Sequence, residues 1–353
     1  TVNDTTIDAA TLNTIEGYSS GATTTTATTI EGSAADIVTA FADADIDHST
    51  VTAATVTGTT VAASDLNTIE SVITGVTTVS EATTLTGTFA EVDETMDHNN
   101  LDADNGGATP ERISGLDNVN VTLTSTTVAV DGALGPTAAN VETLIGKIGT
   151  GNVTATISDT GITDFLNAGS LRITGTGHAL TITLVDDAFT AAQVAAVNDL
   201  DATTTVNIVL DPATAALTSP ALTGTATELA TYLTSTGIDN TGTEATVTVS
   251  DASITVTELN TITDNTSGTV TATLSNNDIA DLEGITGTGN ALTITLVELS
   301  QEASKLNTLA DLTNAGLITA TTVTSVSGTA AEVEDLYSNN LGKFVGGDLI
   351  GAG

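Results

Sequence analysis

The stretch that decides the fold is Gly224-Thr225-Ala226-Thr227-Glu228-Leu229, because close copies of it return along the whole chain. Thr225 is followed three residues later by an acid, which is the capping-box pattern of a helix N-terminus. In that pattern the hydroxyl oxygen accepts a hydrogen bond from a first-turn N–H, and the acid reaches back to the N–H of the capping residue. The stretch therefore predicts a helix that begins directly after Thr225.

We call this pattern the first cassette. Its copies start at Gly32, Gly87 and Gly328, and a looser copy occupies residues 135–141. In each copy a Ser or Thr precedes an acid or an Asn by three residues, and apolar residues follow at helical spacing. We expect one helix at every copy.

A second cassette alternates with the first. It reads Leu66-Asn67-Thr68-Ile69 and recurs at residues 12–15, 259–262 and 306–309, with looser relatives at Leu166-Asn167 and Val197-Asn198. Each series advances by about 50 residues, so the two together predict one helix about every 25 residues. Asn is a mediocre residue inside a helix. The recurrence of Asn at this position indicates one of two arrangements. Either a ladder of Asn side chains donates hydrogen bonds to loop carbonyls of adjacent coils, or each Asn is exposed at a helix end.

Between the helices the pattern changes to a period of two, which is typical of strands. Residues 269–274 alternate Thr with apolar side chains, and a long duplication relates residues 151–158 to 268–275 and 173–185 to 285–297. A strand and a helix repeated along a chain cannot each bury an apolar face alone, but stacked units can.

These patterns predict an α/β protein: a parallel β-α solenoid with about 25 residues per strand-helix unit, in which helices cover one sheet on one side. Residues 1–340 form the repeat solenoid, and residues 341–353 form an apolar, Gly-rich C-terminal tail that we expect to be a subunit contact. A coil of about 50 residues, with two strands and two helices, is the alternative. Thr suits a pleated polar face, so we expect the Thr side of the sheet to stay uncovered.

The amino-acid composition excludes several classes of function. The chain of 353 residues carries 44 Asp and Glu against 5 Lys and Arg, a formal charge of -39, and has no Cys and no Trp. Five cations cannot form a nucleic-acid surface, and no apolar run is long enough to span a membrane. Without aromatic platforms, a thiol or a nucleophile motif, we expect no enzyme.

Acidic turns are the candidate metal sites. Asp43, Asp45 and Asp47 follow one first-cassette helix, and Asp97, Asp102 and Asp104 follow another. Ca²⁺ takes six to eight oxygen ligands, which clustered carboxylates supply. The spacing matches neither an EF-hand nor a glycine-aspartate nonapeptide, so solvated acidic turns are the alternative interpretation. The three histidines, His48, His98 and His178, are expected to lie on the surface. A weak metal site at His48 and His98, which follow Asp47 and Asp97, is the alternative.

The ends of the chain suggest assembly. The second cassette is already present at residue 12, and the tail is apolar, so neither end reads as a polar cap. We expect the ends to meet head to tail, which makes the chain its own partner in an open fibre. The alternative is that the sequence is cut from a longer repeat array.

The stretches Ser64-Asp-Leu-Asn-Thr-Ile69 and Gly328-Thr-Ala-Ala-Glu-Val333 resemble Thr-, Asp- and Asn-rich repeats of very large secreted surface proteins of cyanobacteria and other aquatic bacteria. The resemblance covers nearly the whole chain and implies an extracellular or cell-surface location, an adhesive, surface-layer or filament role, and dependence on Ca²⁺. We therefore expect a subunit of an extracellular filament. A spacer or ligand-binding segment of a large adhesin, with cell-surface glycans as partners, is the alternative.

Overall fold

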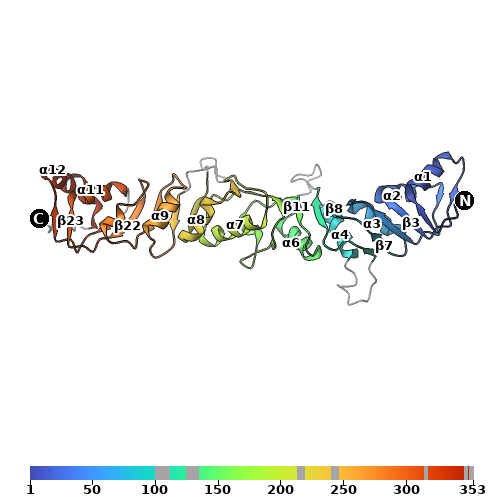
Figure 1. Cartoon of the computed structure of the whole chain (residues 1–353), viewed down its shortest axis with the longest axis horizontal. Helices are drawn as coiled ribbons and strands as arrows, with labels where there is room; N and C mark the ends of the chain where they lie inside the picture. Colours follow the sequence, from blue (N-terminus) through green and yellow to red (C-terminus); the bar gives the residue numbers. More distant parts are fainter. Residues whose placement is uncertain are drawn as a thin grey trace. The chain divides into compact units, whose positions relative to one another are not determined.

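The computed structural model describes residues 1–99, 112–124, 135–212, 219–239, 246–313, 317–345 and 349. The chain forms two compact units, and Figure 1 labels helices and strands along the sequence. The first comprises residues 1–159, 172–182 and 203–206, and the second comprises residues 160–171, 183–202 and 207–353. The predicted repeat region 1–340 is therefore shared between two units.

The helices begin where the cassettes predict them. The described α-helices are α1 (Ala9–Tyr18), α2 (Ala34–Ala42), α3 (Ala63–Val72), α4 (Phe89–Asn99), α6 (Ala138–Lys147), α7 (Ala191–Thr203), α8 (Ala226–Thr234), α9 (Val256–Thr263), α10 (Ile279–Leu282), α11 (Ala303–Leu312) and α12 (Ala330–Asp335). First-cassette copies open α2, α4, α6, α8 and α12, and the second cassette lies within α1, α3, α9 and α11. The helices predicted at the close copies of both cassettes are confirmed.

Capping chemistry explains these starting points. In α8, Thr225 Oγ1 accepts from Glu228 N at 3.3 Å, while Glu228 Oε2 accepts from Thr225 N at 3.0 Å. The same reciprocal pair opens α6, α9 and α12. Each pair satisfies two first-turn N–H groups that the helix itself cannot satisfy.

One looser relative of the second cassette is not a helix. Leu166-Asn167 forms strand β12 (Leu166–Asn167), which follows the 3-10 helix η1 (Ile162–Phe165) and pairs antiparallel with β13 (Ser170–Leu171). Ala168 and Gly169 between them both adopt positive φ. This tight turn reverses the chain and leaves no room for a helix.

All other strand pairs among the described residues are parallel. The strands are β1 (Thr6–Asp8), β2 (Thr23–Thr24), β3 (Thr29–Ser33), β4 (Ile46–Asp47), β5 (Ala53–Thr57), β6 (Thr60–Ala62), β7 (Thr77–Val79), β8 (Thr84–Gly87), β9 (Ile113–Ser114), β10 (Asn120–Leu123), β11 (Val153–Thr156), β14 (Ala179–Thr181), β15 (Thr183–Leu184), β16 (Ala188–Phe189), β17 (Ile208–Leu210), β18 (Ala221–Gly224), β19 (Ile238–Asp239), β20 (Val247–Val249), β21 (Val270–Thr273), β22 (Ala291–Thr295), β23 (Ser300–Glu302), β24 (Leu317–Thr319) and β25 (Ser325–Ser327).

The prediction of a single sheet is wrong, because these strands are divided among several sheets. The first unit holds the orders β1-β3-β5-β7-β9 and β14-β11-β10-β8-β6, and the second holds β16-β18-β20-β21-β22-β24 and β15-β17-β19. Shorter pairs are β2-β4 and β23-β25. Gly58 shows one cause: its φ of 114° bends the chain between β5 and β6, so the two strands join different sheets.

The strand register shows which residues of neighbouring strands pair. Ile30 of β3 pairs with Ile7 of β1 on one side and with Ala54 of β5 on the other. In the second unit, Val247 of β20 pairs with Val270 of β21. A single helix lies between the partners in each of these pairs.

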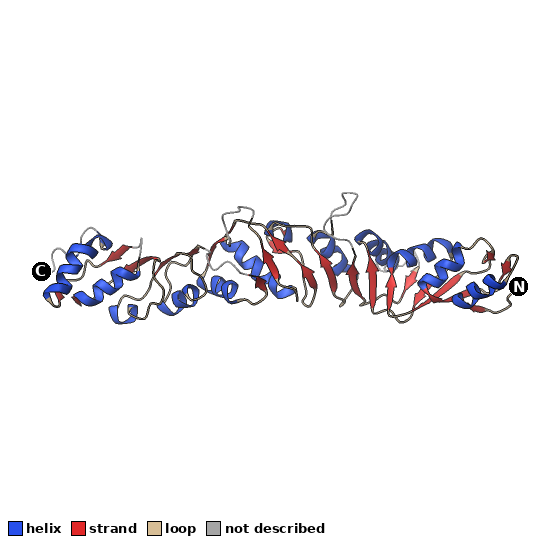
Figure 2. Cartoon of the chain, turned by 90° about the horizontal axis from the view of Figure 1, so that it is seen from above, coloured by secondary structure: helices blue, strands red, loops and turns tan. Residues whose placement is uncertain are grey.

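Apolar residues of the strands and helices form the core of each unit. Within the first unit α1 contacts α2, α2 contacts α3 and α3 contacts α4, so helices pack in chain order beside the strands (Figure 2). In the second unit the same order holds from α8 to α9 and from α10 to α12. On β22 the apolar residues Leu292 and Ile294 are buried and Thr293 and Thr295 are exposed, as expected for an uncovered Thr side.

Candidate functional site

The structure brings Asp43 and Asp45 together with Glu16, at the ends of α1 and α2. One carboxylate oxygen from each of the three lies within 4.8 Å of the others. Asp43 is the C-cap residue of α2, and its Oδ1 also accepts a hydrogen bond from Asp45 N at 2.9 Å. Among the residues that the structure describes, this is the one group of three side chains arranged to hold a metal ion.

The electrostatics of this acidic cluster are repulsive. The negative charge of Asp43 raises the pKa of Glu16 above its usual value, and desolvation and Asp45 add to the effect. A bound cation would remove this repulsion. Hard ions such as Ca²⁺ prefer carboxylate oxygens, and three carboxylates supply from three to six of them.

The other predicted ligands do not join this acidic cluster. Asp47 Oδ1 accepts from Ser49 N at 3.1 Å, and hydrogen bonding by Ser49 lowers the pKa of Asp47. Asp97 Oδ1 lies 2.5 Å from Lys147 Nζ, which also pairs with Asp93 Oδ1 at 2.6 Å, so Asp97 is engaged in an ion pair on α4 and α6. Asp102 and Asp104 lie outside the described residues.

Glu16 is the ligand that the sequence prediction missed. It lies in α1, the helix before the one that Asp43 caps, and so about one repeat unit upstream of Asp43. A search for acids one unit apart, and not only for acids adjacent in sequence, would have found it.

The prediction that His178 lies on the surface is wrong. It is 3% exposed, its Nδ1 accepts a hydrogen bond from Val153 N at 3.1 Å, and its Nε2 lies 3.0 Å from Thr174 O. Because a backbone N–H only donates and a carbonyl only accepts, Nε2 carries the proton and both ring nitrogens are occupied. His178 is therefore a structural residue and not a free metal ligand.

The duplicated segment has an Asn in the place of His178. Asn290 is also 3% exposed, and its Oδ1 accepts from Val270 N at 3.0 Å. The two side chains satisfy the equivalent strand N–H group in the two units. The position requires a buried acceptor and does not require imidazole chemistry.

The other two histidines are half-buried and do not form a metal site together. His48 Nδ1 lies 3.1 Å from Ile46 O. His98 Nδ1 lies 3.9 Å from an oxygen of Glu70, a nearly buried acid whose other oxygen is 2.7 Å from Arg112 Nε.

The recurrent Asn donates to a backbone carbonyl of the next coil, as the predicted ladder requires. Asn260 Nδ2 donates to the loop carbonyl of Gly284 at 2.7 Å, whereas the other copies donate to a carbonyl in the first turn of the next helix. Asn67 Nδ2 donates to Glu91 O at 3.0 Å. Asn13, Asn198 and Asn307 donate in the same way to Asp36 O, Glu228 O and Glu332 O. For these copies the acceptor is the capping-box residue of the next first-cassette helix. The Asn therefore fixes the register of a second-cassette helix on the first-cassette helix that follows it.

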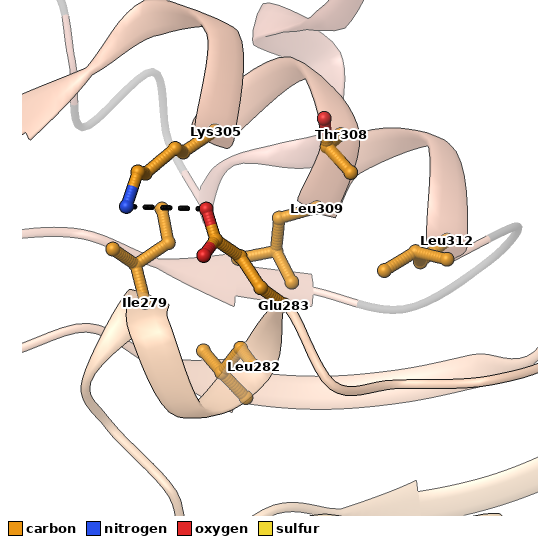
Figure 3. A pocket seen from close by; sticks show the side chains of 7 residues that line it. All are labelled: Ile279, Leu282, Glu283, Lys305, Thr308, Leu309 and Leu312. Carbon is orange, nitrogen blue, oxygen red and sulfur yellow. Dashed lines mark ion pairs between the residues drawn. The ribbon is translucent and has the colours of Figure 1, made fainter.

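The helix that precedes a second-cassette helix makes an apolar contact with it instead. Ile279 and Leu282 of α10 line a shallow notch together with Leu309 and Leu312 of α11, and the Lys305–Glu283 ion pair of 3.1 Å lies at its edge (Figure 3). Leu309 is 2% exposed. Its equivalents Ile69 and Ile262 are fully buried, and α3 and α9 contact the preceding helices α2 and α8.

In α1 and α12 the equivalent apolar positions are not buried in this way. Ile15 of α1 occupies the position of Ile69 and Leu309 but is 37% exposed, and Tyr18, one turn further on, is 88% exposed. In α12 no residue is buried, whereas the matching residues Ala226 and Leu229 of α8 are. Both helices present apolar positions that another repeat covers elsewhere in the chain.

The described tail residues fold onto their own unit. Phe344 and Leu349 are buried, Phe344 forms a parallel β-bridge with Ile318 of β24, and Tyr337 Oη donates to Leu349 O at 2.8 Å. Their side chains are thus already covered within the chain.

Comparison of the chain with protein-family models, with curated proteins and with solved structures found no match. Among the described residues, no helix combines the length and the apolar character that crossing a membrane requires.

Proposed function

We propose that this chain is a non-enzymatic structural protein, a parallel β-α solenoid whose subunits join head to tail in an extracellular filament. The observation that carries the proposal is the exposure of Ile15, at a position that is buried in α3, α9 and α11. Full burial of an exposed Ile contributes about 1.5–3 kcal/mol; because Ile15 is 37% exposed, covering its remaining surface contributes roughly a third of this. An exposed copy of an internally buried contact favours association with another repeat.

The geometry of stacking supports a fibre. The surface at α1 differs from the surface at α12, so a contact between them joins unlike faces of two copies. Such a heterologous contact leaves one face free at each end and generates an open assembly unless rotation closes a ring.

The charge of the chain sets conditions for assembly. Subunits with a net charge of -39 repel each other until salt or cations screen them, over about 8–10 Å at moderate ionic strength. We propose Ca²⁺ as the ion at Glu16, Asp43 and Asp45. Calcium sites of extracellular modules bind at about 10⁻⁴–10⁻³ M, a range that suits a small, partly exposed cluster.

Negative-stain electron microscopy of the purified chain tests the proposal. Filaments are expected at physiological ionic strength with millimolar Ca²⁺, and a chelator is expected to shorten them. Single particles at every protein concentration, in salt and in Ca²⁺, would refute filament formation.

The second candidate function is a spacer or ligand-binding segment of a large adhesin or surface-layer protein, related to the repeat family that the sequence resembles. The same uncovered faces support it, because they would accept any repeat of this kind. Particles that stay single and bind to cells or immobilised glycans would favour this function over the filament.

A further inference from the structure

We infer that α1 of one copy packs on α12 of a second copy, and that this contact repeats the internal contact between a second-cassette helix and the helix before it. The inference rests on the proposed head-to-tail assembly and names the surfaces that make it. The occupant of each face is a second copy of this chain.

The internal contacts provide the template. Three second-cassette helices, α3, α9 and α11, pack on the helix before them, and the residue equivalent to Ile15 is buried in all three. In α11 the covering side chains are Ile279 and Leu282 of the short helix α10 (Figure 3). Because α1 carries the same cassette, it presents the same face, and in its own unit Ile15 remains 37% exposed.

The matching face on the second copy is that of α12. Ala330 and Val333 are the equivalents of Ala226 and Leu229 in α8, the helix on which α9 packs. Ala226 and Leu229 are buried, whereas α12 has no buried residue. Seating α1 against α12 would cover both faces in the way that α8 and α9 cover each other.

The Asn hydrogen bonds decide the polarity of the contact. A second-cassette helix uses its Asn to bind the helix that follows it, and both relevant bonds are already made within one chain: Asn13 to Asp36 O at 3.0 Å, and Asn307 to Glu332 O at 3.0 Å. The contact that α1 and α12 have not made within one chain is therefore the apolar one. In that contact α12 takes the place of the helix that precedes a second-cassette helix, and α1 takes the place of the second-cassette helix.

Acids surround this apolar contact. Glu16 follows Ile15 on α1, and Glu332, Glu334 and Asp335 lie on α12. Like charges on the two faces repel at low ionic strength and are screened by salt. We expect the critical concentration for assembly to fall as salt rises.

Two single variants and one control test the inference. I15E blocks the α1 face and V333E blocks the α12 face, and each is expected to raise the critical concentration at least about tenfold, because a charge enters an apolar contact. The control is V72E: Val72 on α3 is 41% exposed, close to the value for Ile15, but lies on an internal helix. V72E is expected to assemble like the wild type. Circular dichroism and the urea midpoint confirm that each variant is folded.

Mixing the two variants gives the decisive readout. I15E retains an intact α12, and V333E retains an intact α1, so a 1:1 mixture is expected to form a complex of two chains and no longer species in analytical ultracentrifugation. Each variant alone is expected to sediment as one chain.

Failure of the α12–α1 contact can be distinguished from failure of filament formation. If the wild type forms filaments but I15E and V333E polymerise as well, or if their mixture forms no pair, the α12–α1 contact is wrong while the filament stands. If the wild type itself never assembles, the proposed function fails and this inference fails with it.

Discussion

Replacing His178 tests whether the buried ring is a structural acceptor, as its hydrogen bonds indicate. In H178A the N–H of Val153 and the carbonyl of Thr174 lose their partners at 3.1 and 3.0 Å. A buried donor left unsatisfied costs about 1–3 kcal/mol, and the cavity left by the ring adds to this. We expect H178A to lower the free energy of unfolding of the first unit by about 2–4 kcal/mol.

The matched variant is H178N, which copies Asn290 of the duplicated segment. Asn can accept from Val153 N in the way that Asn290 accepts from Val270 N. We expect H178N to remain within about 1 kcal/mol of the wild type, because the acceptor is retained and only ring volume is lost. H178L keeps the volume but not the acceptor, so it should show only the hydrogen-bond part of the H178A loss, about 1–3 kcal/mol.

Amide hydrogen exchange at Val153 gives the local readout. A loss of about 2 kcal/mol corresponds to exchange about 30-fold faster at this N–H, since about 1.4 kcal/mol is a factor of ten. Urea unfolding followed by circular dichroism gives the global cost. The reasoning is refuted if H178L is as stable as H178N and Val153 exchanges equally slowly in both.

The remaining predictions concern a cap, an inter-helix bond and the acidic cluster. Hydrogen bonds from Thr255 lower the pKa of Glu258. The charge of Glu258 therefore stabilises the fold above the unfolded pKa of 4.5, and this contribution is lost as pH falls through the lower folded pKa. We expect E258Q to lower the free energy of unfolding by about 0.3–1 kcal/mol at neutral pH and not at all in strong acid, measured as the difference in urea midpoints from wild type. N67L removes the donor to Glu91 O and should cost about 1–2 kcal/mol in the same assay, and a wild-type midpoint would show that this bond does not fix the helix pair. D43N should raise the melting temperature in chelator, because it relieves the repulsion with Glu16, and should reduce the further rise produced by millimolar Ca²⁺; an unchanged response to Ca²⁺ would exclude this cluster as the calcium site.

Helix positions could be predicted because the interactions that start a helix are local. Thr225 and Glu228 are close in the sequence, and their reciprocal hydrogen bonds depend on no other part of the chain. The spacing of the helices was likewise visible in the sequence, and a single helix lies between paired strand residues such as Ile7 and Ile30. The division into several sheets was not visible, because a turn such as that at Gly58 redirects a strand without changing its alternating pattern.

The candidate site depended on contacts between repeats. Asp43 and Asp45 were identified as candidate ligands by their own turn, but their neighbour Glu16 comes from the preceding helix. Asp97 pairs with Lys147 of α6, the next described helix, which contacts α4. His178 shows the same limit: nothing in its local sequence indicates that the N–H of Val153 needs an acceptor.

The sequence by itself determined which residues form helices, which face of each strand is apolar and how far apart the repeats lie, since these follow from capping and periodicity over a few residues. Only the tertiary structure decided which side chains of adjacent repeats meet. A side chain reaches a partner one repeat away only when strand register and helix phase are both set, and these are properties of the stacked repeats and not of any one of them. The exposed Ile15 and the buried Ile69 have the same local sequence, and they differ in whether another helix packs against them.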